Sequence, residues 1–162
     1  AGTLAVTSRI GAPGGGGLGG DPNRNCGGGG GGSGGAVLLE ARQLALGPAA
    51  RITANGGAGA EGDDDAPATF SAGQDGRTDG PLPARGGDSS NNASTGGDGG
   101  AGSIPPTEGE SFCCSTGGGG GGGGAVGRIR VNAASGCSFQ GGVPELFSPK
   151  PTSNQAGDAG CP

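Results

Sequence analysis

The stretch GGGGGGGGAVGRIRV, residues 117–131, joins an unbroken run of glycines to a segment with the alternation of a β-strand. A second version lies upstream, where the glycine-rich residues 27–35 lead into Ala36-Val37-Leu38-Leu39-Glu40. The rest of the chain leads into, separates or cross-links these two units. The fold therefore depends on what a long glycine run does when it lies next to a strand.

Glycine dominates the composition, and large apolar side chains are scarce. The chain has 162 residues, of which 46 are Gly and 4 are Phe, and it contains no Trp, Tyr or Met. Because so few large side chains are available for burial, a conventional hydrophobic core cannot be the main source of stability. Disorder is one alternative that this composition leaves open. The small net charge of -5 favours instead an ordered chain held by backbone hydrogen bonds, cross-links or assembly.

Three structures are compatible with the glycine runs. Flexible linkers are the simplest, but linkers do not usually have a cysteine at one end and an Ala-Val strand at the other. A phosphate-binding loop needs a Lys-Ser/Thr ending, or a GxGxxG pattern between a strand and a helix, and neither run has this context. The third is the extended threefold polyglycine II helix, several copies of which exchange N–H···O=C bonds. We predict a bundle of such segments near residues 14–20, 27–35, 56–59, 96–102 and 117–124.

Short strands are predicted around the glycine runs. Leu4-Ala5-Val6-Thr7 alternates in polarity as a strand does. The composition of Leu38–Leu46 is also compatible with a helix, but glycines bound the segment, it has no N-cap, and its last apolar residues alternate. We therefore predict two strands there, Val37–Ala41 and Gln43–Leu46.

An Arg-Ile repeat, Arg-Ile-x-small apolar-Asn/Pro, occurs three times, at residues 9–13, 51–55 and 128–132. In a strand, residues two apart share a face, so each Ile is predicted to point inwards, and Thr53 and the three arginines to point to solvent. A longer module runs from a cysteine through a glycine run to Ala-Val, starting once at Cys26 and once at Cys114. In this alignment Ala36 is equivalent to Ala125. Repeats with little apolar surface each are typical of stacked architectures.

These patterns predict an all-β or irregular fold with little or no helix. Short strands and polyglycine II-type segments would pack in a solenoid- or sandwich-like bundle, stapled by disulfides. A single domain, 1–162, would comprise a repeat module (26–59), a polar loop insertion (58–111), a second module (113–136), and a C-terminal lid and tail (137–162). The insertion is predicted to be a surface loop with little regular structure, anchored by Phe70 and Phe112. The predicted lid consists of Cys137, Phe139, Val143, Leu146 and Phe147.

Five cysteines in a chain with so thin a core indicate an oxidising, extracellular compartment, with free thiols in a cytosolic protein as the alternative. The neighbours Cys113 and Cys114 are expected to have different partners. We hypothesise that Cys26 pairs with one of them, because Cys26 and Cys114 open equivalent glycine runs. Cys161 would then pair with Cys137 or with the other neighbour. The odd count leaves at least one cysteine unpaired or bonded between chains.

Residues for catalysis are missing. The chain has no His, which removes the usual general base and the Ser-His-Asp and Cys-His arrangements, so we expect no enzymatic activity and no cofactor. Asp63, Asp64 and Asp65 are weak candidates for a calcium loop, but no EF-hand or GGxGxD spacing surrounds them, and a solvated acidic loop is favoured. The pI near 4.5 argues against nucleic acid as a partner. No apolar run is long enough for a membrane span.

Three segments carry a resemblance to a known group of proteins. They are the glycine run ending in Ser-Gly-Gly-Ala-Val-Leu-Leu-Glu-Ala (29–41), Ile-Thr-Ala-Asn-Gly-Gly (52–57), and the glycine run ending in Ala-Val-Gly-Arg-Ile-Arg-Val-Asn (117–132). They resemble uncharacterised glycine-rich secreted or surface proteins of myxobacteria and related bacteria. This resemblance implies an exported, cell-surface or matrix role without catalytic residues. The expected packing is also similar to phage tail-fibre adhesin tips and springtail antifreeze proteins, although strict Gly-x-x triplets are absent.

The sequence therefore favours a non-enzymatic extracellular structural or adhesive protein, a subunit of a surface fibre or matrix. Its partners would be further copies of itself or the cell surface. The alternative is a recognition module that binds a carbohydrate or a cell surface through loop 58–111. An ice-binding protein is the third alternative.

Overall fold

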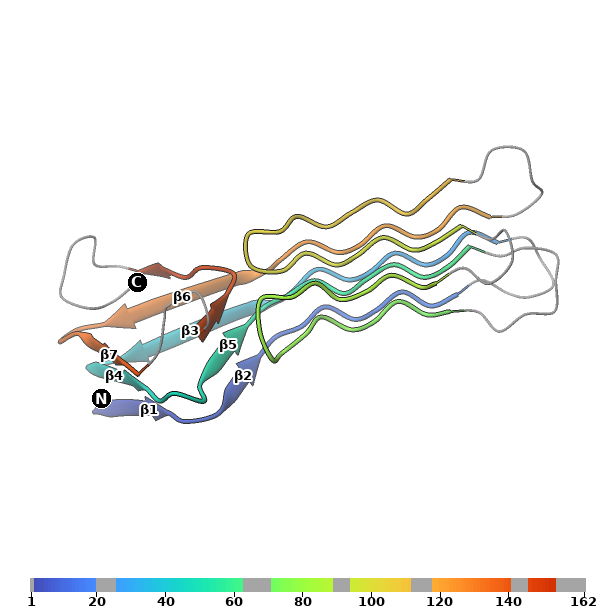
Figure 1. The fold of residues 1–162 in the computed structure, drawn as a ribbon. Helices are drawn as coiled ribbons and strands as arrows, with labels where there is room; N and C mark the ends of the chain where they lie inside the picture. The colour runs from blue at the N-terminus through green and yellow to red at the C-terminus, as the bar shows by residue number, and fades with distance from the viewer. Residues whose placement is uncertain are drawn as a thin grey trace.

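The computed structural model of the chain describes residues 2–19, 26–62, 71–88, 94–111, 118–140 and 146–153. Every element with described bounds is a β-strand, which confirms the prediction of an all-β chain. The strands occupy one end of the molecule, here called the coil region because the chain winds through it in successive circuits. Extended segments that lie side by side, here called the bundle, project from this region (Figure 1). The strands are β1 (Thr3–Val6), β2 (Arg9–Gly11), β3 (Ala36–Ala41), β4 (Gln43–Leu46), β5 (Arg51–Thr53), β6 (Arg128–Ala133), β7 (Cys137–Phe139), β8 (Phe147–Ser148) and β9 (Thr152–Ser153).

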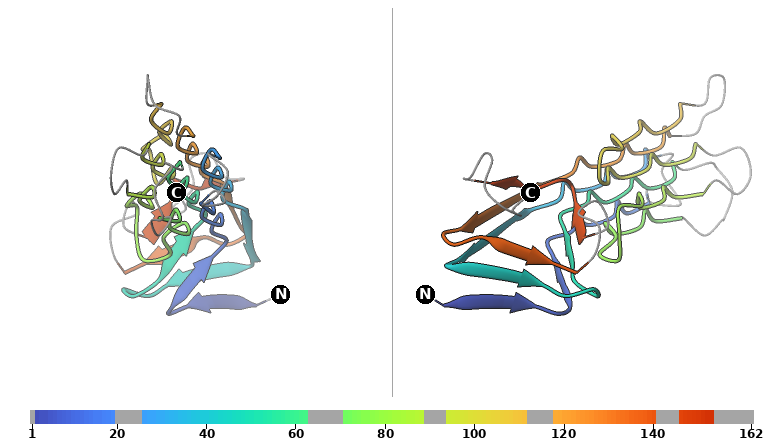
Figure 2. Two further views of the ribbon diagram at one scale, coloured as in Figure 1. Left: turned by 90° about the vertical axis from the view of Figure 1, so that its right-hand side faces the viewer. Right: turned by 60° about the vertical axis from the view of Figure 1, so that its left-hand side comes forward.

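Three parallel sheets make up the coil region, with strand orders β1-β4-β7, β2-β5-β8 and β3-β6-β9 (Figure 2). The chain adds one strand to each sheet on each circuit, first through β3, β4 and β5 and then through β6, β7 and β8. Equivalent residues therefore stack from one circuit to the next: Leu4 lies opposite Leu44, and Ile10 lies opposite Ile52. Each circuit covers the apolar residues of its neighbour, so very short strands suffice to form a core.

The predicted strands over 37–46 are confirmed, and the helical alternative is wrong. In β3 the exposure alternates, with Val37 and Leu39 buried and Leu38 exposed, as a period of two requires. Val131 of β6 lies opposite Leu39 and is also buried. Because the inward residues of all three sheets meet, a chain this poor in apolar residues still has one continuous core.

The described members of the predicted lid belong to the last circuit of strands and not to a separate cover. Phe139 of β7 lies opposite Leu46, and Phe147 of β8 lies opposite Ile52. The two phenyl rings meet edge to face with centroids 6.2 Å apart. Leu146 is buried beside them, and Val143 lies outside the described residues.

The inward orientation predicted for the isoleucines of the Arg-Ile repeat is confirmed: Ile52 and Ile129 are buried, and Ile10 is partly buried against the core. The three copies do not all lie in one sheet. Arg9-Ile10 pairs with Arg51-Ile52. Arg128-Ile129 instead pairs with Ala36-Val37 in another sheet, so Ala36 lies opposite Arg128 and not opposite Ala125. The predicted alignment of the two modules is therefore shifted by three residues from the observed register. Because hydrogen bonds in the bundle recur every third residue, a shift of three leaves the pattern of the glycine run unchanged.

The bundle is built from segments that leave the coil region after β2 and β5 and return at β3 and β6. Their backbones are joined by hydrogen bonds between segments. They lie side by side over their whole described length (Figures 1 and 2). The described segments are 12–19, 26–35, 54–62, 71–77, 81–88, 94–100, 105–111 and 118–127.

Residues 54–62, the central segment, bond to neighbours in three directions in turn. The N–H of Gly56 donates to Gly100, that of Gly57 to Gly32, and that of Ala58 to Gln74. The next three residues repeat the same three directions. The central segment thus donates to segments 26–35, 71–77 and 94–100, and it accepts from segments 12–19, 81–88 and 118–127.

These six neighbours form a closed ring around the central segment, because each is also bonded to the next. In order around the ring they are 12–19, 26–35, 118–127, 94–100, 81–88 and 71–77. Segment 105–111 lies outside the ring, bonded to 94–100 and 118–127. The central segment is buried along its entire length.

The prediction that 58–111 is a surface loop with little regular structure is therefore wrong for its described part. Residues 58–62 lie at the centre of the bundle, and 71–77, 81–88 and 94–100 form half of the ring. Polar residues suggested a solvated loop, but a threefold segment at the rim exposes only some of its residues. The rest can be small and buried, as Ala84 and Gly87 are. The proposed anchors Phe70 and Phe112 lie outside the described residues.

Candidate functional site

Glycine is a steric requirement along the central segment. A Cβ on Gly56 would lie 1.9 Å from the backbone oxygen of Gly124, and one on Gly59 would lie 1.8 Å from that of Gly121. No real side chain tolerates such distances, so neighbouring segments approach this closely only because these positions have no side chain. The intervening Ala58 and Ala60 are fully buried, and their methyl groups fill the remaining space.

At the rim, one strip of glycines has no such steric reason. We call this strip the bare face. It runs over three consecutive members of the ring, and a Cβ at most of its positions would meet only ordinary contacts: the nearest atom to one on Gly30 lies at 3.6 Å, and on Gly122 at 3.9 Å. None of these glycines has a φ in the left-handed region. The bare face consists of Gly15, Gly27, Gly30, Gly119 and Gly122, all of them exposed.

The N–H groups of the bare face are unpaired among the described residues, whereas the carbonyls of Gly15, Gly119 and Gly122 accept bonds from neighbouring segments. By contrast, the N–H groups of the two residues that follow Gly30 and Gly122 do donate. The carbonyl of Gly30 accepts no described hydrogen bond. Since the pattern recurs every third residue, unpaired groups follow one another at intervals of about 9 Å along each segment. The bare face is therefore a surface without side chains that presents unpaired N–H groups and, at Gly30, an unpaired carbonyl.

The other side of the bundle carries polar side chains instead. Segments 81–88, 94–100 and 105–111 line a shallow groove of about 430 Å³. Several of these side chains bond to neighbouring backbone: Asp98 accepts from the N–H of Gly86 at 2.9 Å, and Thr107 accepts from the N–H of Asp98 at 2.7 Å. The charged residues of this groove are Arg85, Asp88, Asp98, Glu108 and Glu110.

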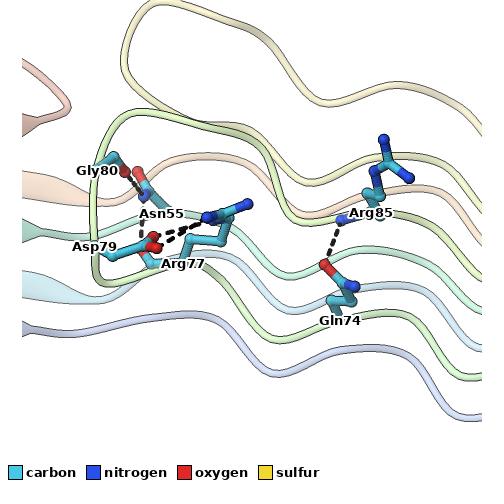
Figure 3. A network of polar contacts seen from close by, with 6 residues as sticks. All are labelled: Asn55, Gln74, Arg77, Asp79, Gly80 and Arg85. Carbon is cyan, nitrogen blue, oxygen red and sulfur yellow. Dashed lines mark hydrogen bonds and ion pairs between the residues drawn. The ribbon is translucent and has the colours of Figure 1, made fainter.

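A buried polar pair joins the bundle to the coil region. The hydroxyl of Ser148 in β8 donates to Oδ1 of Asn55 at 2.6 Å and accepts from the N–H of Gly102 at 2.8 Å. The Asn55 amide donates to the carbonyls of Arg77 and Gly80, at 2.7 and 3.0 Å (Figure 3). Two turns of residues 58–111 lie at the end of the bundle next to the coil region and are here called the near-end turns, 77–80 and 101–104. Both are thus fixed by hydrogen bonds to one pair of buried side chains, Asn55 and Ser148.

Turn 77–80 has its own ion pair on the surface (Figure 3). Arg77 donates from Nε and Nη2 to the two carboxylate oxygens of Asp79, at 3.0 and 2.8 Å. The hydrogen bond from Arg77 lowers the pKa of the Asp79 carboxyl, and the same contact raises the pKa of the Arg77 guanidinium. Because both side chains are well exposed, the pair shapes the turn more than it stabilises the fold.

The prediction that Thr53 faces solvent is wrong, because turn 77–80 covers this side of its sheet. A Cβ on Gly11 would lie 2.8 Å from Cγ2 of Thr78 and 3.2 Å from Oγ1 of Thr53, so the three residues meet. Thr53 is 1% exposed, and its hydroxyl has no hydrogen-bond partner among the described residues.

An apolar groove of about 600 Å³ lies where the two near-end turns meet β8. Two of its residues, Leu82 and Ile104, are among the few large apolar side chains left exposed in the described chain, at 56% and 46%. Sequence reasoning missed this groove, because only the fold brings its three segments together. The apolar groove is lined by Pro81, Leu82, Ala101, Gly102, Ser103, Ile104, Phe147 and Lys150.

Most of the site residues predicted from sequence cannot be compared with the structure. Asp63, Asp64, Asp65, Cys113, Cys114 and Cys161 lie outside the described residues. Cys26 lies half-buried where segment 26–35 begins, and Cys137 begins β7 and is disulfide-bonded. No disulfide joins two residues of the described part, so the pairing of Cys26 with Cys113 or Cys114 stays a prediction.

Among the described residues, no cluster of three His, Cys, Asp or Glu side chains is placed to hold a metal ion. The same part of the chain contains no helix of the length and apolarity needed to cross a membrane. In comparisons with known proteins, no family model, curated protein or solved structure matches this chain.

Proposed function

We propose that this chain is a non-enzymatic structural protein of the cell exterior that assembles with further copies of itself through the bare face. Its coil region would be a β-solenoid and its bundle a polyglycine II array. One strand per sheet on each circuit supports the first assignment. Three-direction bonding with a repeat of three residues supports the second. The disulfide at Cys137 supports an oxidising compartment.

The proposal rests on the surroundings of Gly30. It has room for a side chain, yet it is glycine, and both its N–H and its C=O are unpaired among the described residues. Inside the bundle, the same groups of neighbouring glycines are satisfied by another extended segment at close approach. An extended segment from a second copy could form hydrogen bonds with these groups in the same way. A side chain at Gly30 would prevent that segment from coming close enough. A face that carries both free donors and free acceptors can pair with its own copy in a two-fold interface.

Sedimentation velocity over a range of concentrations tests this assembly. The wild-type chain is expected to associate as concentration rises, and the double variant Gly30→Arg, Gly122→Arg is expected to remain a monomer. Ala72→Arg is the matched control, because it adds the same side chain at an exposed position of segment 71–77, away from the bare face. A wild-type chain that stays monomeric at every concentration would refute the proposal, as would equal loss of association in the Ala72 variant.

Recognition of a surface through residues 58–111 is the second candidate, and the apolar groove favours it, since both turns that form the groove belong to this insertion. Ice binding by the bare face is a third candidate. Measurement of thermal hysteresis on the same variants separates it from self-association: ice binding would give hysteresis in a monomeric wild-type chain that the double variant lacks.

A further inference from the structure

We infer that the apolar groove is a binding site for a small amphiphile, a molecule with an aliphatic or aromatic body and a carboxylate at one end. This site is separate from the bare face and does not depend on the proposed assembly. Its volume of about 600 Å³ is in the range of small-molecule sites.

The groove is a pre-formed site, because hydrogen bonds to the buried side chains of Ser148 and Asn55 fix both turns that line it. Ala101 and Ile104 exchange two backbone hydrogen bonds, of 3.0 and 2.8 Å, across a tight turn in which Gly102 has a φ of 59°. The N–H of Gly102 is held by the buried hydroxyl of Ser148. Pro81 directly follows Gly80, whose carbonyl is held by Asn55. Leu82 and Ile104 are therefore presented by anchored backbone.

The lining indicates an apolar occupant. The lining includes Leu82, Ile104, Pro81 and Ala101, together with Phe147, which is only 3% exposed as a residue. Exposure of two large aliphatic side chains to water is unfavourable, and an apolar body that covers them recovers about 25 cal/mol for each Å² removed from water.

The charge of the lining indicates an anionic end. Among the described residues that line the groove, Lys150 is the only charged one, and it is the only lysine of an acidic chain. Its ammonium has no ion pair among the described residues, so it is available to a carboxylate. Ser103 adds a hydroxyl to the lining. A neutral molecule of the same length would lose the ion pair with Lys150, which at an exposed site weakens binding about two- to fivefold.

Titrations with octanoate and with octanol, followed by the amide resonances of the ¹⁵N-labelled chain, test the site. Octanoate is expected to give saturable shifts at Leu82, Gly102, Ile104 and Lys150, and octanol to bind two- to fivefold more weakly. Lys150→Gln is expected to remove that difference without weakening octanol binding. Ile104→Glu is expected to weaken octanoate at least about tenfold, and Ile104→Ser is the milder variant should the first disturb the turn.

Leu38→Glu is the matched control, because Leu38 is exposed to the same 56% as Leu82 but lies on the outer face of β3. The inference is overturned by shifts that do not saturate, by equal affinity for octanoate and octanol, or by a loss in Leu38→Glu as large as that in Ile104→Glu.

Discussion

The Ser148 hydroxyl donates a hydrogen bond of 2.6 Å to Oδ1 of Asn55, across 93 positions of sequence and between the last circuit of the coil region and the first residues of the central segment. Neither side chain has access to water. This pair fixes where the bundle leaves the coil region, and the Asn55 amide extends the same network to turn 77–80.

Replacement of Asn55 by Ala should therefore lower the free energy of unfolding by about 1–3 kcal/mol, because it removes the hydrogen-bond partner of the buried Ser148 hydroxyl and of the partly buried carbonyls of Arg77 and Gly80. Urea denaturation measures the change. Asn132→Ala is the control: Asn132 also bonds a side chain, Glu40, but at the surface, and its loss should cost less than about 1 kcal/mol. Equal losses would show that the buried network has no special role.

Replacement of Gly59 and replacement of Gly30 by alanine should have different effects on the stability of the fold. Gly59→Ala places a methyl 1.8 Å from a backbone oxygen and should cost more than about 3 kcal/mol. Gly30→Ala meets nothing closer than 3.6 Å and should be neutral or stabilising by up to about 1 kcal/mol, because alanine restricts the unfolded chain. Thermal unfolding of the two variants compares them directly. A loss of stability at Gly30 would mean that the monomer itself needs this glycine.

Hydrogen exchange should follow a three-residue pattern in the glycine run. The amides of Gly121 and Gly124 donate to the central segment and should exchange slowly, whereas those of Gly119 and Gly122 are unpaired and should exchange rapidly. Amide exchange followed by NMR in dilute solution, where the chain is a monomer, resolves the four residues. Uniform rates along the run, fast or slow, would contradict the bonding of the bundle.

Thr53→Val should stabilise the fold by about 1 kcal/mol. The substitution keeps the branched shape and removes a hydroxyl that is buried without a partner. Urea denaturation measures the gain. A loss instead would show that the hydroxyl has a partner in solution, such as a buried water.

The carboxyl of Asp79 should titrate below its ordinary pKa of about 3.9 because Arg77 hydrogen-bonds to its charged form. Since the folded pKa is depressed, the contribution of the pair to stability is present above about pH 4 and is lost as the pH falls through the folded pKa. NMR titration of the carboxyl carbon measures this pKa, and Arg77→Gln should raise it. An unchanged pKa in that variant would rule out the ion pair in solution.

The sequence was sufficient to predict the strands and the use of glycine runs as packed segments. Alternation in Val37–Ala41 and the inward orientation of Ile52 and Ile129 follow directly from side-chain periodicity. It was not sufficient to identify the centre of the bundle, which is residues 54–62 and not the glycine run 117–124. An unbroken glycine run does not identify the central segment, because in a segment of the ring only some positions need glycine. In this run Gly121 and Gly124 have no room for a side chain, whereas Gly119 and Gly122 do.

The missed signal was glycine at intervals of three within polar sequence. The predicted bundle included 56–59 and 96–102 but not segment 71–77, where Gly73 and Gly76 show this spacing. This spacing matches the threefold repeat of an extended segment, with polar residues free to occupy the outward positions. The apolar groove had no comparable signal, because its turns and Lys150 are far apart in sequence.

The bundle departs from the coil region at β2 and β5 and returns at β3 and β6, so each departure is made of an even number of segments, out and back. The shorter departure contains two segments and the longer contains six. Duplication or deletion of one out-and-back pair would thus alter the girth of the bundle while leaving every strand of the coil region in register.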